Sequence, residues 1–184
     1  MESFRGFIAV ELPVTEEILS IGNDISHSDA QVKLVQPENI HITLKFLGQT
    51  PTQQIENIET IMKQSITDIQ PHTINLIGTG VFPNERYIKV IWIGIKQGEQ
   101  LATIASSLNN QLSALGFKKE KRSFSPHLTI GRMKTAKGKE HILSIIEKYK
   151  ETIFAEVNVQ EIILKKSTLT PKGPIYETIT SVSL

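Results

Sequence analysis

Hydrophobic and polar positions along the chain follow two alternating periods, which predict a mixed α+β fold. Apolar residues recur at helical spacing in four segments, and between them they alternate or run continuously, as in strands. The predicted helices cover about residues 15–25, 50–69, 99–115 and 139–149. The predicted strands cover about residues 4–12, 31–35, 40–47, 72–81, 87–95, 127–130, 152–165 and 175–182.

Two of the predicted strands carry the same polar pair, a histidine followed two positions later by a threonine. The pairs are His41 with Thr43 and His127 with Thr129. In an extended strand this spacing places both side chains on one face. Two imidazoles and two hydroxyls can then line one groove.

Strand alternation divides the neighbours of the first pair between two faces. Lys45 is predicted to share the face of His41, and the alternate positions are predicted to form the core. The predicted core positions are Ile40, Ile42, Leu44 and Phe46. We also expect Trp92 to be a core residue, because it lies in the middle of the most apolar strand.

The order of the predicted elements repeats along the chain. The two motif histidines are 86 positions apart, and the same shift lays the segment 4–9 on the segment 90–95. We therefore expect an α+β, bilobal single domain over residues 1–184, with a pseudo-twofold axis. Each lobe, about 1–86 and 87–184, is predicted as strand-helix-strand-helix-strand, with possible exchange of terminal strands and with antiparallel sheets lining a central cleft.

Composition excludes several classes of protein. The chain has 184 residues, 39% of them hydrophobic and 21% charged, which is typical of a soluble globular protein. It has no cysteine, which removes disulfides, thiolate metal sites and cysteine nucleophiles. A net charge of +1 argues against a protein that coats nucleic acid non-specifically. With no signal-peptide core or membrane-length apolar run, we expect a cytoplasmic monomer without a membrane partner.

Five landmarks in order make the chain resemble a known family, the 2H phosphoesterases. Within that family the chain is most similar to the RNA 2′,3′-cyclic phosphodiesterases, long called 2′–5′ RNA ligases. The landmarks span the chain from end to end and are Phe7 to Pro13, Pro37 to Gly48, Gly78 to Pro83, Ser125 to Arg132, and Ser167 to Tyr176.

The resemblance implies an activity and a set of site residues. The activity is hydrolysis of RNA ends bearing a 2′,3′-cyclic phosphate to 2′-phosphomonoesters, without a metal or other cofactor. The active set would be His41, Thr43, His127 and Thr129, and Arg132 would meet the phosphate. Strand parity places Arg132 opposite the histidine face, so that role requires a bend at Gly131.

The chemistry of the two motifs suits that reaction. Opening a cyclic phosphodiester by in-line attack requires a base on the water and an acid on the departing ribose oxygen. Histidine, whose ordinary pKa is about 6.5, can serve as either near neutral pH. By analogy with the family we hypothesise that His41 is the acid and His127 the base, and that the threonine hydroxyls donate to the phosphoryl oxygens.

Further residues are possible substrate contacts. They are Lys45, Lys121 and Arg122, the last two in a basic loop just before the second motif, and Tyr176 near the end of the chain. Lys45 could equally lie at the rim, and Tyr176 could equally be core. The remaining histidines are interpreted as structural residues, namely His27, His72 and His141.

Several alternatives stay open. The same acid and base could join RNA ends through a 2′–5′ linkage, or act on small cyclic nucleotides such as ADP-ribose cyclic phosphate. A non-catalytic RNA-end binding module is a third possibility, although it would not need both histidine–threonine pairs. A zinc protein is a fourth, but neither motif contains a cysteine or an acidic residue to complete a site.

Overall fold

The structure is a computed structural model that describes residues 2–184. Its strands are β1 (Ser3–Glu11), β2 (Val32–Leu34), β3 (His41–Pro51), β4 (His72–Asn84), β5 (Tyr87–Lys96), β6 (His127–Met133), β7 (Ile153–Val159), β8 (Glu161–Thr170) and β9 (Gly173–Ser183). Its α-helices are α1 (Glu16–Ser26), α2 (Ile55–Ser65), α3 (Glu99–Ser113) and α4 (Lys139–Lys148). Two short 3₁₀-helices are η1 (Pro37–Asn39) and η2 (Thr52–Gln54).

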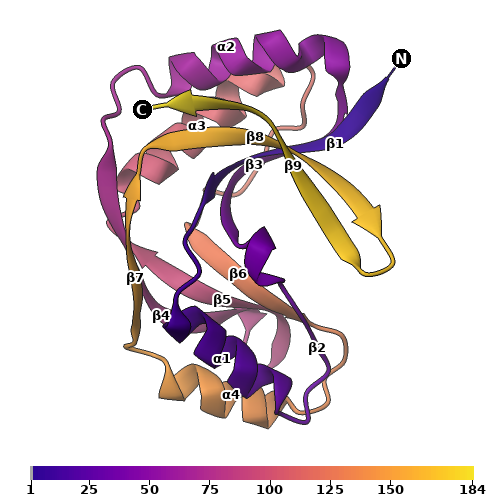
Figure 1. Ribbon diagram of the computed structural model, residues 1–184, viewed down its shortest axis with the longest axis vertical. Coiled ribbons are helices and arrows are strands. Elements are labelled where there is room, and N and C mark those ends of the chain that lie inside the picture. The colour runs from indigo at the N-terminus through magenta and orange to yellow at the C-terminus, as the bar shows by residue number, and fades with distance from the viewer. Residues whose placement is uncertain (1) are drawn as a thin grey trace.

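The strands form two antiparallel sheets, each with a pair of helices. The first-motif sheet has the order β3-β1-β8-β9, and the second-motif sheet has the order β2-β6-β5-β4-β7. Helices α2 and α3 pack together on the first-motif sheet, and α1 packs on α4 beside the second-motif sheet (Figure 1). The predicted α+β fold with two antiparallel sheets is confirmed.

Each sheet takes strands from both halves of the chain. Strand β4 lies in the second-motif sheet, and β8 and β9 lie in the first-motif sheet, so the sheets are not the segments 1–86 and 87–184. The predicted single strand over 152–165 is also wrong, because this segment is divided between the two sheets. The chain leaves one sheet at Val159 and enters the other at Glu161, which makes β7 and β8 separate strands.

The two motif strands are related by the predicted shift of 86 residues, but the strands paired with them are related by a different shift. Glu11 of β1 lies opposite His41, and Gly94 of β5 lies opposite His127. The equivalent positions in β1 and β5 are thus 83 apart, and the predicted superposition of 4–9 on 90–95 is three residues out of register. The cause is a connection between the paired strands that is three residues longer in the second half.

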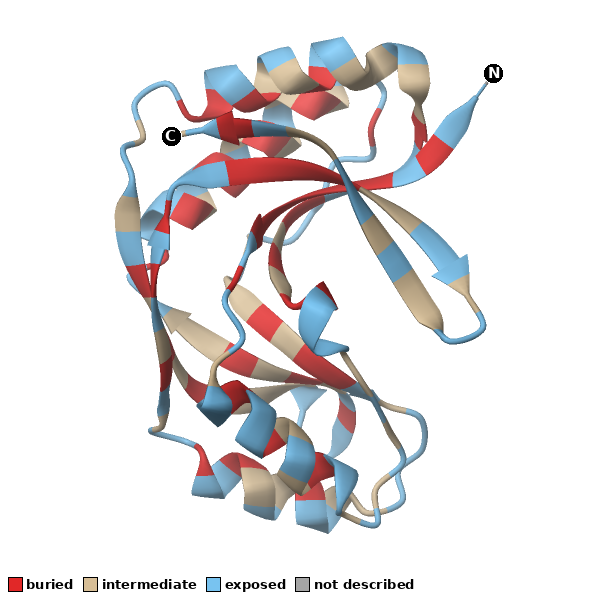
Figure 2. Ribbon diagram, in the orientation of Figure 1, coloured by how far each residue is buried: buried red, intermediate tan, exposed pale blue. Residues whose placement is uncertain are grey.

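Apolar side chains from both sheets and all four α-helices form one buried cluster. Figure 2 shows buried residues along the strands and on the inner faces of the helices. Ile42 and Leu128, which lie between the polar residues of the two motifs, are fully buried. In residues 2–184 no helix is long and apolar enough to cross a membrane.

Candidate active site

The two motif strands meet where the two sheets approach each other. Strand β3 contacts β6 although the two belong to different sheets. In each strand the histidine and the threonine are only partly buried, whereas the residue between them has no exposed surface. The alternation predicted for His41, Thr43, His127 and Thr129 therefore places all four on the side of their strands away from the core.

Both imidazole rings are oriented by the same type of hydrogen bond. Nδ1 of His41 lies 2.7 Å from the carbonyl oxygen of Asn39, and Nδ1 of His127 lies 2.7 Å from that of Ser125. A carbonyl oxygen can only accept, so in each neutral ring Nδ1 carries the hydrogen. Nε2 is then the nitrogen that can take up or release a proton in both rings.

The Nε2 atoms have different surroundings. Nε2 of His41 is 2.9 Å from the hydroxyl oxygen of Thr43, which donates to the neutral ring and accepts from the charged one. For Nε2 of His127, the described part of the chain supplies no hydrogen-bond partner. The second ring therefore presents an uncommitted proton acceptor.

Aromatic side chains pack on both rings. Phe7 and Tyr176 lie against His41, with ring centroids 4.9 Å and 5.3 Å away, and Phe82 lies edge-on to His127 at 5.1 Å. Trp92 contacts Phe82 at 5.1 Å, lies directly opposite Thr129 and is half-buried, so it is on the histidine face and is not the core residue expected.

Burial lowers the pKa of His41 below its ordinary value. Desolvation is the largest cause, and the positive charge of Lys165 adds to it, while the Asn39 hydrogen bond and the charge of Glu11 act in the opposite direction. The neutral ring is therefore favoured in the unliganded protein. An acid role for His41 needs a bound negative charge, such as a phosphate, to raise that pKa again.

A β-bulge follows the threonine in both motif strands. In β3, Thr43 and Lys45 pair with consecutive residues of β1, so Leu44 is the extra residue. In β6, Thr129 and Gly131 pair with consecutive residues of β5, so Ile130 is the extra one. An inserted residue reverses the side to which later side chains point. Regular alternation therefore gives the wrong face beyond each bulge.

Because of the first bulge, the faces predicted for Lys45 and Phe46 are wrong. Lys45 lies opposite Ile8, a core residue, and is 2% exposed. Phe46 lies opposite Phe7, which contacts His41, and is 57% exposed. Directly opposite residues share a face. Lys45 thus points into the helix layer, and Phe46 stands on the histidine face.

The second bulge supplies the bend that the role of Arg132 required. Ile130 and Gly131 are both buried, and the next residue, Arg132, is exposed. Arg132 therefore returns to the face of His127 and Thr129. Burial raises the pKa of the Tyr176 hydroxyl, and the positive charges of Arg5 and Arg132 oppose that rise. Because Tyr176 packs on His41, the charge of Arg132 reaches the aromatic side chain next to the first motif.

The other predicted contacts lie around the basic loop between α3 and β6. The ammonium group of buried Lys45 donates to Oδ1 of Asn109 at 2.8 Å and to the carbonyl oxygen of Lys118 at 2.6 Å. These bonds fix the start of the loop that leads to His127. Lys121 and Arg122 are exposed in the middle of that loop.

The remaining histidines lie outside the motif strands' shared face. His27 is bonded to Asn23 at the end of α1, and His72 is bonded to Gln70 at the start of β4. His141 pairs with Asp29 on the surface of α4. Within residues 2–184 no group of three potential metal-ligating side chains gathers.

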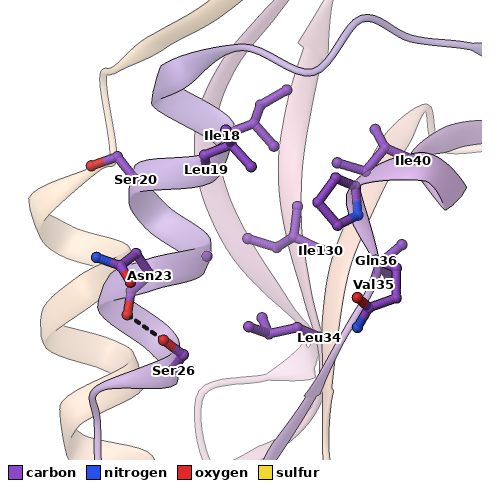
Figure 3. Close-up of a pocket in the computed structure, with 12 residues that line it drawn as sticks. Ile18, Leu19, Ser20, Asn23, Ser26, Leu34, Val35, Gln36, Ile40 and Ile130 are labelled. Carbon is purple, nitrogen blue, oxygen red and sulfur yellow. Dashed lines mark hydrogen bonds between the residues drawn. The ribbon is translucent and has the colours of Figure 1, made fainter. Parts of the chain in front are cut away.

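A cavity of about 540 Å³ lies behind the motifs, between α1 and the segment that joins β2 to η1 (Figure 3). Ile40 and Ile130 line it, so it touches the strands next to the active set. Its lining includes none of the four motif histidines and threonines, and Figure 3 shows mostly apolar side chains pointing into it. The cavity is therefore distinct from the histidine face.

Three site residues were not found from the sequence. Asn39 holds His41, and Phe7 and Phe82 pack on the two imidazoles. Asn39 also donates from its side chain to the carbonyl oxygen of Pro174, 135 residues later. Alternation along β1 predicts that Phe7 points to the opposite face from its neighbours in the chain. Only the register with β3 shows that this face is the one that carries His41.

Comparison with known proteins adds independent findings. Residues 7–184 match the family model described as the AKAP7 2′5′ RNA ligase-like domain. The RNA 2′,3′-cyclic phosphodiesterase of Methanocaldococcus jannaschii is 44% identical over 177 residues, which cover 95% of this chain and 98% of that protein. The enzyme of the same name from Methanothermobacter thermautotrophicus is 37% identical, with 94% of each chain covered.

Solved structures agree with this relationship. A crystal structure of a protein from Thermus thermophilus aligns with a TM-score of 0.79 and 27% identity, covering 98% of this chain and 97% of that one. The E. coli LigT structure in complex with 3′-AMP has a TM-score of 0.71 at 22% identity, covering 100% and 99%, and shares the fold. The chain belongs to the 2H phosphoesterases, in the family of the RNA 2′,3′-cyclic phosphodiesterases, also known as 2′–5′ RNA ligases.

Proposed function

We propose that this protein hydrolyses RNA ends bearing a 2′,3′-cyclic phosphate to 2′-phosphomonoesters by two-histidine acid–base catalysis. The observation that carries the proposal is the matched anchoring of His41 and His127. Each Nδ1 is held by a backbone carbonyl at 2.7 Å, which leaves each Nε2 for proton transfer. The curated relatives named RNA 2′,3′-cyclic phosphodiesterase support the same reaction.

The proton transfers are divided between the two rings. Nε2 of His127, without a partner in the described chain, takes a proton from water as the water oxygen attacks phosphorus. The bond between phosphorus and the 3′ oxygen breaks, and protonated Nε2 of His41 gives its proton to that oxygen. The product carries its phosphate at the 2′ position. His127 is left protonated and His41 neutral, and proton exchange with solvent restores both rings.

The threonines and Arg132 act on the phosphoryl oxygens. The hydroxyls of Thr43 and Thr129 lie on the histidine faces and can donate where negative charge increases in the transition state. The guanidinium group of Arg132 supplies a fixed positive charge on the same face as His127. The bound phosphate in turn favours protonated His41, which burial alone disfavours.

The residues of the site supply both the acid and the base, so we propose that the reaction needs no metal. The direct test is hydrolysis of an RNA oligonucleotide ending in a 2′,3′-cyclic phosphate, in EDTA, with the product phosphate located at 2′ or 3′. We expect full activity and a 2′-phosphate. Loss of activity in EDTA would contradict metal independence, and a product joined 2′–5′ to an added RNA with a free 5′-hydroxyl would favour the ligase direction.

A further inference from the structure

The short edge strand β2 places a lysine beside Arg132. Lys33 lies directly opposite Arg132 in the β2–β6 pair, and directly opposite residues of an antiparallel pair project from one face. Val32 and Leu34, on either side of Lys33, project to the other face and are partly buried against the core. Lys33 therefore stands on the same face as Arg132 and, beyond the bulge, His127.

The ammonium group of Lys33 is free to meet a ligand. The residue is exposed, and its side chain makes no hydrogen bond or ion pair with any residue between 2 and 184. The lysines of β8 differ, because Lys165 pairs with Glu11 and Lys166 pairs with Glu177. An unpaired lysine next to an arginine is an arrangement that suits a chain of phosphates.

The position of Lys33 suits a second phosphate better than the reacting one. Lys33 is one strand further from the motif than Arg132, and Cα atoms of facing residues in antiparallel strands are about 4.5–5.5 Å apart. Strand β2 is the edge of its sheet, so nothing in that sheet lies beyond it. In Figure 1 this edge is on the same side of the molecule as the β8–β9 hairpin, which carries Tyr176.

We propose that Lys33 binds the internucleotide phosphate on the 5′ side of the terminal nucleotide. An RNA strand fills this subsite, whereas a nucleoside 2′,3′-cyclic monophosphate has no phosphate to place there. The inference rests on the proposed function, since it assumes that the cyclic phosphate lies between the two histidines. It makes β2 the element that distinguishes RNA ends from small cyclic nucleotides.

The basic loop at residues 118–126 is the rival path for the RNA strand. It precedes the first residue of β6, whereas Arg132 and Lys33 lie toward the opposite end of that strand. Lys121 is exposed in the loop and serves to test this path. Lys63 serves as the control, because it is exposed on α2, in the helix layer on the far side of the first-motif sheet from the histidine face.

The test compares two substrates with the same terminal base, an RNA trinucleotide ending in a 2′,3′-cyclic phosphate and the corresponding nucleoside 2′,3′-cyclic monophosphate. We expect Lys33→Ala to raise KM for the trinucleotide by about three- to tenfold, as for loss of one charge-assisted contact, and to leave KM for the mononucleotide within about twofold. Lys33→Arg, which keeps the positive charge, should have the wild-type KM for the trinucleotide. Lys63→Ala should behave as wild type on both substrates.

Binding of the trinucleotide product with a 2′-phosphate gives a readout that does not depend on turnover. The slope of log K against log salt should fall by about 0.7 in Lys33→Ala, the value for one phosphate contact on a single strand. Equal effects of Lys33→Ala on both substrates, or an effect of Lys121→Ala in its place, would overturn the inference. If the slope differs between wild type and Lys33→Ala as expected, but the wild-type protein hydrolyses neither substrate, the result would instead contradict the proposed function.

Discussion

The two motif strands repeat the same histidine–threonine pair in different surroundings. Both present a histidine and a threonine, anchor Nδ1 to a carbonyl two residues upstream, and insert a bulge directly after the threonine. Beyond the bulge they diverge. The inward position is Lys45 in β3 and Gly131 in β6, and the next position, on the histidine face, is Phe46 in β3 and Arg132 in β6.

The two halves of the chain thus share the histidine–threonine pair but differ in the side chains around it. The groups proposed to transfer protons are the same in both lobes and aromatic rings pack on both, while the exposed residue that follows the bulge is aromatic in β3 and cationic in β6. Phe7, Tyr176 and Phe46 surround the His41 face, and Arg132 with Lys33 extends the His127 face. We infer that catalysis is shared between the lobes and that substrate recognition is divided between them.

The largest expected effect removes either imidazole. His41→Ala and His127→Ala should each lower kcat by about 10²–10⁴-fold, the range for loss of one positioned acid or base. The matched control is His27→Ala, because His27 is bonded only near the end of α1 and should leave kcat unchanged. A variant at either motif that keeps wild-type kcat would show that the two strands do not share the chemistry.

The next comparison uses the equivalent positions after the bulges. Arg132→Ala should lower kcat/KM by about 10–150-fold on every cyclic phosphate, as expected for loss of a hydrogen bond to a charged group. Phe46→Ala should act mainly on KM, because an exposed aromatic ring on this face can stack on a base. Steady-state kinetics on one RNA substrate separates the two effects. Equal changes in kcat for both variants would contradict the division of roles.

Lys45 provides a smaller effect, on stability. Lys45→Ala removes the donor to the carbonyl oxygen of Lys118 and to Asn109 and should destabilise the fold by about 1–3 kcal/mol, measured by denaturant unfolding. The control is Lys121→Ala, an exposed lysine of the same loop, which should stay within about 0.5 kcal/mol of wild type. An unchanged Lys45→Ala midpoint would exclude an anchoring role.

The smallest expected effect is a lowered pKa of one side chain, the His41 imidazole. Because burial lowers the pKa of His41, its NMR titration in the free protein should have a midpoint below about 6.5. If His41 is the acid, kcat/KM must fall as the pH rises through that midpoint, because the proton it donates is then lost. If kcat/KM instead falls as the pH drops through it, His41 acts as the base.

Much of the fold could be predicted from local sequence, because helical and strand periods are local properties. The motif residues could be predicted as well, since two polar residues at a spacing of two share a face in any regular strand. The roles of Lys45 and Phe46 could not, because a bulge is defined by pairing with another strand. The division of 152–165 into two strands has the same cause, since only tertiary contacts show that β7 and β8 enter different sheets.

Lys33 illustrates the same limit. Its exposure and its place opposite Arg132 depend on the β2–β6 register, which brings together residues 99 positions apart. In the sequence it is one lysine in a short extended segment, without a motif of its own. Patterns within one strand thus predicted that each histidine and threonine share a face, and pairing between strands was needed to find the groups around them.

The central claim is that His41 protonates the leaving 3′ oxygen while His127 activates water. A cyclic substrate with sulfur in place of the bridging 3′ oxygen tests it most directly, because a thiolate leaves with little need for an acid. We predict that His41→Ala regains most of its lost kcat on the sulfur substrate, while His127→Ala stays as impaired as on the oxygen substrate. Recovery of His127→Ala alone would reverse the assignment, and recovery of neither variant would contradict the two-histidine division of acid and base.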